Sequence, residues 1–182
     1  MGQPGELPEG HPALPQDGGA GSGQPQEAYP SGEAGAAPDP DDREVQWHRP
    51  PHWQDNPDRS PLAYASFIVH TDAGHVHVNV TPLRGEGGGL LENVNMWRRQ
   101  VGLERIDDLD QQPVDAIEVD GREGRLVDIV GRPHGETLRT LVAVVPDGWR
   151  HWYFRMSGPG EAVEMQREPF LAFLQSVRFE SE

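Results

Sequence analysis

The sequence contains no cysteine, no lysine and no long hydrophobic run. Without cysteine the chain has no disulfide, no thiolate nucleophile and no thiolate metal site, and it suits an oxidising or a reducing compartment equally. All fifteen basic residues are arginine, which we attribute to coding bias rather than to function. No apolar stretch is long enough to cross a bilayer, and the N-terminus lacks the charged and apolar regions of a signal peptide. We therefore predict that no segment of this sequence spans a membrane directly.

Cationic surface is also scarce. The formal net charge of −15 divides into −8 on residues 1–44, which hold nine acids and one arginine, and −7 on the remainder. Neither part offers a cationic surface to a phosphate backbone or to an anionic membrane. We therefore expect no nucleic-acid partner.

The first forty residues contain seventeen glycines or prolines and almost no bulky apolar side chains. Such a segment cannot bury enough surface to offset the loss of chain entropy. We predict a disordered acidic arm over residues 1–45 and a single domain over residues 46–182. An arm of this composition suits a membrane tether of the lipoprotein type, which predicts a periplasmic or membrane-tethered extracytoplasmic location. An entropic bristle that only improves solubility explains the arm equally well.

Two β-rich runs, residues 63–70 and 75–82, flank the turn signal of residues 72–74 and predict a hairpin. Pairing across this turn places alternate residues on opposite faces. One face is apolar: Ala65, Phe67, Val69, Val76, Val78 and Val80. The other face is predicted to be wet or covered by another element: Tyr64, Ser66, Ile68, His70, His75, His77 and Asn79.

Residues 88–102 show the clearest helical periodicity in the chain. The apolar stripe that must pack on the sheet is Leu90, Leu91, Val94, Trp97 and Val101. Gly102 is predicted to cap the helix in a left-handed conformation. Arg98 falls beside the stripe, so we expect its guanidinium to bond a carboxylate or helix-end carbonyls at the core boundary. Trp97, Arg98 and Gly102 are therefore assigned structural roles.

The rest of the chain predicts two more hairpins, a broken helix and a final strand. The expected elements are a helical turn at 106–109, strands at 114–119, 124–130, 138–145 and 149–156, a helix opening at Pro159 that kinks or restarts at Pro169, and an edge strand at 177–179. The order hairpin, helix, hairpin, hairpin, helix, strand predicts an α+β fold in which helices are layered on an antiparallel sheet.

Several short motifs resemble the PsbP-like fold, a superfamily that includes photosystem II extrinsic subunits and the Ran-binding Mog protein. They are Pro51-His52-Trp53, the hairpin after it, Ser157-Gly158-Pro159 and the run 170–179. Residues 89–103 also resemble a segment of uncharacterised bacterial proteins that often carry lipoprotein-type N-termini. The resemblance covers residues 50–180 and implies an α/β/α sandwich. It also implies a non-catalytic, often extracytoplasmic binding or assembly module, and it supplies no catalytic residues.

Three histidines form the clearest candidate for chemistry. His75 and His77 are two residues apart on a strand and share a face, and His70 lies across the same hairpin. Three converging imidazoles are a ligand set for zinc or copper, with one position left open. The flanking side chains include no carboxylate ligand, and exposed strand histidines are commonly plain polar surface. A periplasmic metal-binding protein is therefore the alternative hypothesis, and the first expectation is that no cofactor is bound.

The sequence shows no catalytic group, because its serines lack the context of a nucleophile elbow and cysteine is absent. The Gly-rich loop of residues 85–89 lacks Lys, Ser and Thr and contains Glu86, which argues against a phosphate site. We predict a non-enzymatic module that binds a protein partner, such as a membrane complex. Its expected contact surface is the wet hairpin face with Tyr64 and Asn79, the Gly-rich loop, and Trp149 at a hairpin end.

Overall fold

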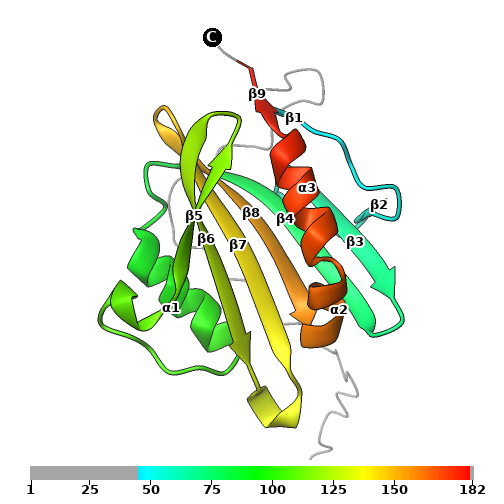
Figure 1. Cartoon of the computed structure of the whole chain (residues 1–182), viewed down its shortest axis with the longest axis vertical. Coiled ribbons are helices and arrows are strands. Elements are labelled where there is room, and N and C mark those ends of the chain that lie inside the picture. Colours follow the sequence, from blue (N-terminus) through cyan, green and yellow to red (C-terminus); the bar gives the residue numbers. More distant parts are fainter. Residues whose placement is uncertain (1–44, 181–182) are drawn as a thin grey trace, which may run out of the picture.

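One antiparallel sheet of seven strands organises the described residues, 45–180, of this computed structural model (Figure 1). The strands, in their order across the sheet, are β2 (Gln54–Asp55), β3 (Ala65–Thr71), β4 (Gly74–Arg84), β8 (Arg150–Pro159), β7 (Leu138–Asp147), β6 (Arg122–Gly131) and β5 (Val114–Val119). A separate two-stranded sheet pairs β1 (Val45–Gln46) with β9 (Arg178–Phe179). The predicted arm of residues 1–45 lies outside the described residues except for Val45.

Helices lie on both faces of the sheet. Figure 1 shows α2 and α3 in front of the sheet and α1 behind it. The helices are α1 (Leu90–Gln100), α2 (Gly160–Met165) and α3 (Arg167–Ser176), with single 3-10 turns η1 (Leu109–Gln111) and η2 (Pro133–Gly135). This α/β/α arrangement confirms the predicted fold class. Within residues 45–180, no helix is long and apolar enough to cross a membrane.

The hydrophobic core is divided between the two sides of the sheet. On the side of α2 and α3, aromatic and aliphatic residues of β3, β4, β7 and β8 pack against Phe170, Phe173 and Leu174. On the other side, Val94 and Trp97 of α1 pack on β6, β7 and β8. Strands β7 and β8 are therefore buried on both faces, as their near-continuous apolar sequences indicate.

Tight turns set the register of the hairpins. Asp72 and Ala73 join β3 to β4, and Ala65 pairs with Val80 as the alternation predicts. The β5–β6 loop is Asp120-Gly121, whose φ angles of 49° and 74° match a type I′ turn. Gly148, with φ 60°, is the first of two loop residues between β7 and β8, as in a type II′ turn.

Several element boundaries differ from the prediction. The 3-10 turn comes three residues later than expected, at Leu109–Gln111, where the side chain of Asp108 accepts a hydrogen bond from the Asp110 amide. Strand β8 continues to Pro159, so that Pro159 precedes α2 rather than lying in its first turn. The helix restarts at Arg167, which places Pro169 in the first turn of α3. The final strand pairs with β1 rather than with an edge of the main sheet.

Gly131 allows the end of α1 to approach β6 closely. This contact predicts that a side chain at position 131 lowers the stability of the protein. A Cβ atom added at Gly131 would lie 2.0 Å from the carbonyl oxygen of Val101. Gly131→Ala is therefore expected to displace the end of α1 and to lower the free energy of unfolding by about 2 to 3 kcal/mol. Urea unfolding followed by tryptophan fluorescence measures this change.

A matched control is Gly85→Ala, because nothing lies within 4 Å of a Cβ atom added there. The only cost in this variant is that alanine must adopt the positive φ of 59° that glycine adopts without strain. That strain costs about 1 kcal/mol. Equal stability of the two variants would show that the contact between Gly131 and Val101 does not limit helix packing.

Candidate functional site

The part of the sheet face beyond α1, on the far face in Figure 1, is mostly polar, because α1 packs on β6, β7, β8 and the end of β4 but not on β3. Neutral side chains bond one another along this part. Asn56 Nδ2 donates to Ser66 Oγ at 3.2 Å, and Ser66 Oγ donates to Asn79 Oδ1 at 2.7 Å. At the border with α1, Arg155 Nη2 donates to Gln100 Oε1 at 2.7 Å. Asn79, a predicted protein contact, is therefore only partly exposed and is already hydrogen-bonded.

His70 and His75 face each other at the turn end of the β3–β4 hairpin. Their Nδ1 atoms are 2.8 Å apart, and their rings meet edge to face with centroids 4.5 Å apart. Both side chains are exposed. His77 lies two residues further along β4, opposite Ile68. Within residues 45–180, no three His, Asp or Glu side chains are grouped closely enough to hold a metal ion.

The prediction that Tyr64 lies on the polar face is wrong. Its ring packs edge to face against Trp47 and Trp152, with centroid distances of 5.8 and 5.1 Å, on the side of α3. Tyr64 precedes β3, which begins at Ala65, so the strand alternation does not extend to it. The aromatic contacts determine its direction instead.

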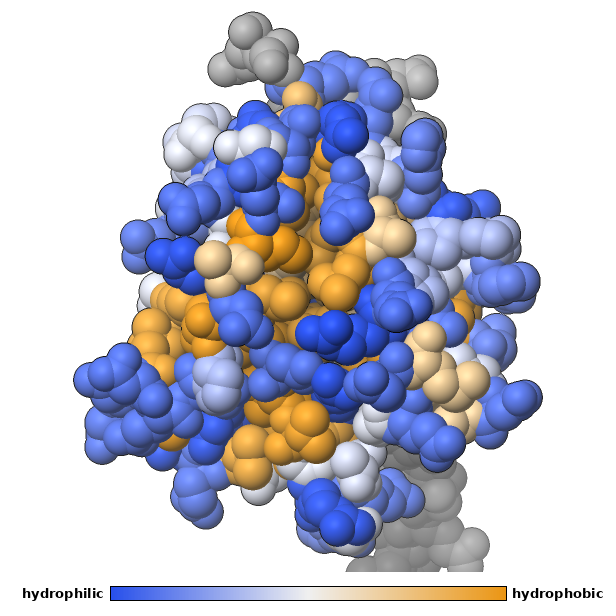
Figure 2. Space-filling model, in the orientation of Figure 1, coloured by the Kyte–Doolittle hydropathy of each residue, from blue (hydrophilic) through white to orange (hydrophobic). Residues whose placement is uncertain are grey.

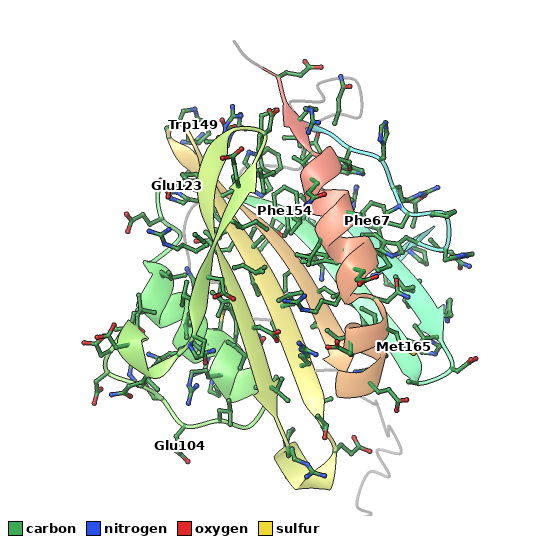
Figure 3. All side chains as sticks on the ribbon, in the orientation of Figure 1. Phe67, Glu104, Glu123, Trp149, Phe154 and Met165 are labelled. Carbon is green, nitrogen blue, oxygen red and sulfur yellow. The ribbon has the colours of Figure 1, made fainter. Side chains whose placement is uncertain are left out.

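Trp149 projects from the turn between β7 and β8, and 60% of its surface is exposed (Figure 3). Two guanidinium groups contact its ring, with Arg84 at 5.1 Å and Arg150 at 5.2 Å from the ring centroid. Arg84 and Arg150 are directly opposite each other on β4 and β8. The sequence does not indicate that these two arginines contact Trp149, because they are 66 positions apart and only the pairing of β4 with β8 brings them to one ring.

The Gly-rich loop of residues 85–89 is held against this end of the sheet. The Gly85 amide donates to the Trp149 carbonyl at 2.9 Å, and the Tyr153 hydroxyl donates to the Glu86 carbonyl at 2.7 Å. Asn93 Nδ2, on the first turn of α1, donates to the carbonyls of Gly87 and Gly89. The loop is thus tied to both β8 and α1.

Trp97, Arg98 and Gly102 lie at the C-terminal half of α1. Trp97 is buried against the sheet. Arg98 Nε donates to the carbonyl of Glu104 at 2.9 Å, and Arg98 Nη1 donates to Gln112 Oε1 at 2.8 Å. Gly102 has φ 76°, and the chain reverses there. These contacts hold the segment after α1 against the helix.

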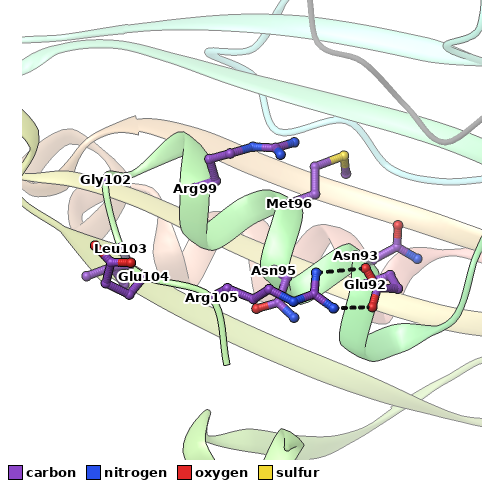
Figure 4. Close-up of a pocket in the computed structure, with 9 residues that line it drawn as sticks. All are labelled: Glu92, Asn93, Asn95, Met96, Arg99, Gly102, Leu103, Glu104 and Arg105. Carbon is purple, nitrogen blue, oxygen red and sulfur yellow. Dashed lines mark hydrogen bonds and ion pairs between the residues drawn. The ribbon is translucent and has the colours of Figure 1, made fainter. Parts of the chain in front are cut away.

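A depression of about 630 Å³ lies between the outer face of α1 and residues 102–105 (Figure 4). Arg105 and Glu92 form a bidentate ion pair beside it, with distances of 2.6 and 3.0 Å. The Asn95 side chain donates to the carbonyl of Ile106 and accepts from its amide. The ion pair lowers the pKa of Glu92 and raises that of Arg105, yet both groups are exposed and contribute little to stability. Glu92, Asn95 and Arg105 beside this depression are thus already hydrogen-bonded within the protein.

Apolar side chains gather on the opposite face, between α3 and the β5–β6 hairpin (Figure 2). Ile117 and Leu171 are partly buried there against the core. On the same side of the sheet Arg139 forms ion pairs with Asp128 of β6 and Glu164 of α2. These ion pairs connect the sheet to α2.

Tyr153 is the buried titratable group of the Trp149 end, and its environment predicts a pH effect. Burial, reinforced by the charge of Glu86, raises the pKa of Tyr153 to about 12. Above pH 10 the unfolded chain therefore loses this proton before the folded chain does, and stability falls. From pH 10 to 12 the wild type should lose about 2 kcal/mol more than Tyr153→Phe in urea unfolding. Parallel pH profiles of the two proteins would contradict the assignment.

The sequence matches no protein-family model and no curated protein. Solved structures similar to this chain are found with low sequence identity. The structure of LpqN, involved in cell envelope biogenesis of Mycobacterium tuberculosis, is 11% identical with a TM-score of 0.46, over 75% of this chain and 83% of that one. A structure from Bacteroides thetaiotaomicron is 9% identical with a TM-score of 0.47, over 76% of this chain and 46% of that one.

The solution structure of PsbP (CyanoP) from Synechocystis sp. PCC 6803 is 14% identical to this chain, with a TM-score of 0.44. The match covers 82% of this chain and 96% of that one. A protein of the PsbP type, which the sequence motifs resemble, is among the solved structures similar to this chain. No residue role is carried over from any of these proteins.

Proposed function

We propose that this domain is a non-catalytic protein-binding or complex-assembly module whose contact surface is the Trp149 cluster, defined as Trp149, Arg84 and Arg150. The exposure of Trp149, together with its contacts to two guanidinium groups, carries the proposal. Tryptophan and arginine are the side chains that contribute most often to binding energy when a partner desolvates them.

The charges of the cluster indicate the chemistry of the partner. Arg84 and Arg150 are like charges in directly opposite strand positions, which disfavours the folded state. Asp147 lies 3.8 Å from Arg150, whereas within residues 45–180 no carboxylate forms an ion pair with Arg84. The Trp149 ring offsets part of this repulsion through its cation–π contacts. A carboxylate from a partner would offset the rest and would accept paired hydrogen bonds from Arg84. The cluster therefore suits an acidic segment of a protein.

The arm joins the domain close to this cluster. Val45 pairs with Phe179, whose ring lies 4.3 Å from the guanidinium of Arg122. Arg122 bonds Asp147, which directly precedes the Trp149 turn. Because residue 44 is covalently bonded to Val45, an arm anchored at a membrane would leave the domain from the same end of the sheet as the Trp149 cluster. We propose such a tethered, extracytoplasmic location on the basis of this placement and the composition of the arm.

The pKa shifts of Glu92 and Tyr153 do not suit these two groups to general acid–base catalysis. The carboxyl pKa of Glu92 is lowered and the phenol pKa of Tyr153 is raised, so both groups move away from neutral pH. General acid–base catalysis requires the opposite change, because a group serves best when its pKa is near the working pH. The polar part of the sheet face is, in addition, occupied by its own hydrogen bonds among Asn56, Ser66 and Asn79.

The test compares Trp149→Ala, Arg84→Glu and the wild type in affinity capture from a membrane fraction of the source organism, followed by titration of the captured protein. Both changes should weaken binding by at least about tenfold, because one removes the aromatic anchor and the other repels a carboxylate. Isothermal titration with the purified partner measures the affinity.

Met165→Ala is the matched control, since Met165 is an apolar residue exposed by 50% and lies far from Trp149 in Figure 3. It should leave the affinity unchanged. Loss of binding with Met165→Ala, or unchanged binding with Trp149→Ala, would assign the contact surface elsewhere.

A further inference from the structure

We propose that His70 and His75 form a two-imidazole site for a divalent copper ion at the end of the β3–β4 hairpin. The site is separate from the Trp149 cluster and does not depend on the function proposed for that cluster. It narrows the three-histidine set expected from the sequence to two ligands, because His77 stands beside Ile68 on β3 rather than beside the other two histidines.

The metal is assigned from its affinity for imidazole ligands. The 2.8 Å between the two Nδ1 atoms is the length of the hydrogen bond between the metal-free rings, so it shows that both nitrogens reach one place without fixing a coordination geometry. Both rings are exposed, and their rotation brings each Nδ1 to about 2.0 Å from one ion. The general order of divalent-metal affinities places Cu(II) above Zn(II), and imidazole is a ligand that suits copper.

The backbone positions of both histidines are set before a metal arrives. His70 and His75 are cross-strand partners. His70 follows the fully buried Val69, and His75 precedes the fully buried Val76. The turn between them is fastened by Thr71, whose Oγ1 donates to the carbonyl of Gly74 at 2.8 Å and accepts from the amide of Ala73 at 3.1 Å. Metal binding would therefore order little more than two side-chain rotamers, which keeps its entropic cost low.

A metal ion can replace the hydrogen that the Nδ1 atoms of His70 and His75 share. At 2.8 Å one Nδ1 must donate its hydrogen to the other. A copper ion bound to both Nδ1 atoms requires each neutral ring to carry its hydrogen on Nε2 instead, so the donor ring changes tautomer and no net proton is released. Modest rotation of the exposed rings directs both lone pairs at the metal. Water completes the coordination on the solvent side.

The charge of the protein also favours a cation here. The chain carries a formal net charge of −15, which attracts divalent cations from solution. Asp72 lies in the adjacent turn and is exposed. It is not grouped with the two histidines as a ligand, so its contribution is limited to the local field.

The test is titration of the full chain with CuCl₂ by isothermal calorimetry, with electron paramagnetic resonance of the loaded protein. One saturable site of micromolar affinity is expected, with a spectrum typical of two imidazole nitrogens. His70→Gln and His75→Gln should each weaken binding by at least about tenfold. ZnCl₂ should bind more weakly than CuCl₂.

Three control variants distinguish this site from copper binding elsewhere on the chain. His52→Gln removes another exposed histidine, His77→Gln removes the neighbour on β4, and Trp149→Ala disrupts the proposed protein contact; all three should retain copper binding. Binding that survives both His70→Gln and His75→Gln overturns the proposal. Loss of binding in His52→Gln or His77→Gln overturns the assigned ligand pair. Thermal unfolding without metal shows that each variant is folded, and the two single variants test the site independently of each other.

Discussion

The alternation of side chains along β8 is the constraint on which the rest of the structure depends. Trp152, Phe154 and Met156 point to the side of α2 and α3, where all three are fully buried. Tyr153 and Arg155, between them in the sequence, point to the side of α1. Because β8 lies in the middle of the sheet, its two faces supply both halves of the core, and a shift of one residue would exchange them.

Helices cover the two faces of the sheet to different extents, and this difference determines which polar side chains are accessible. Helices α2 and α3 cover aromatic residues from β3 and β8, whereas α1 covers β6, β7, β8 and the end of β4 at Leu83. The uncovered part of β3 and β4 must be polar, and it is occupied by hydrogen-bonded neutral groups and by histidines. The hairpin end, where backbone pairing stops, leaves His70 and His75 open to solvent.

The two proposed sites lie at opposite ends of β4, and this separation gives them different physical characters. At one end Gly74 begins the strand beside the histidine pair, where neutral imidazoles offer lone pairs to a cation. At the other end Arg84 meets Trp149, where cationic groups and an aromatic ring offer contacts to a carboxylate-bearing partner. Strand β1, from which the arm continues, pairs with β9.

The amino-acid sequence by itself determined the fold class, the order of elements and the register of the β3–β4 hairpin. These features depend on local patterns: alternation in strands, the 3.6-residue period of α1, and turn residues such as Asp120-Gly121. Only the tertiary structure decided that Tyr64 turns into the core, that β9 pairs with β1, and that Arg84 and Arg150 flank Trp149. Each of these depends on contacts between residues far apart in the chain, and local periodicity carries no information about which distant strand becomes the neighbour.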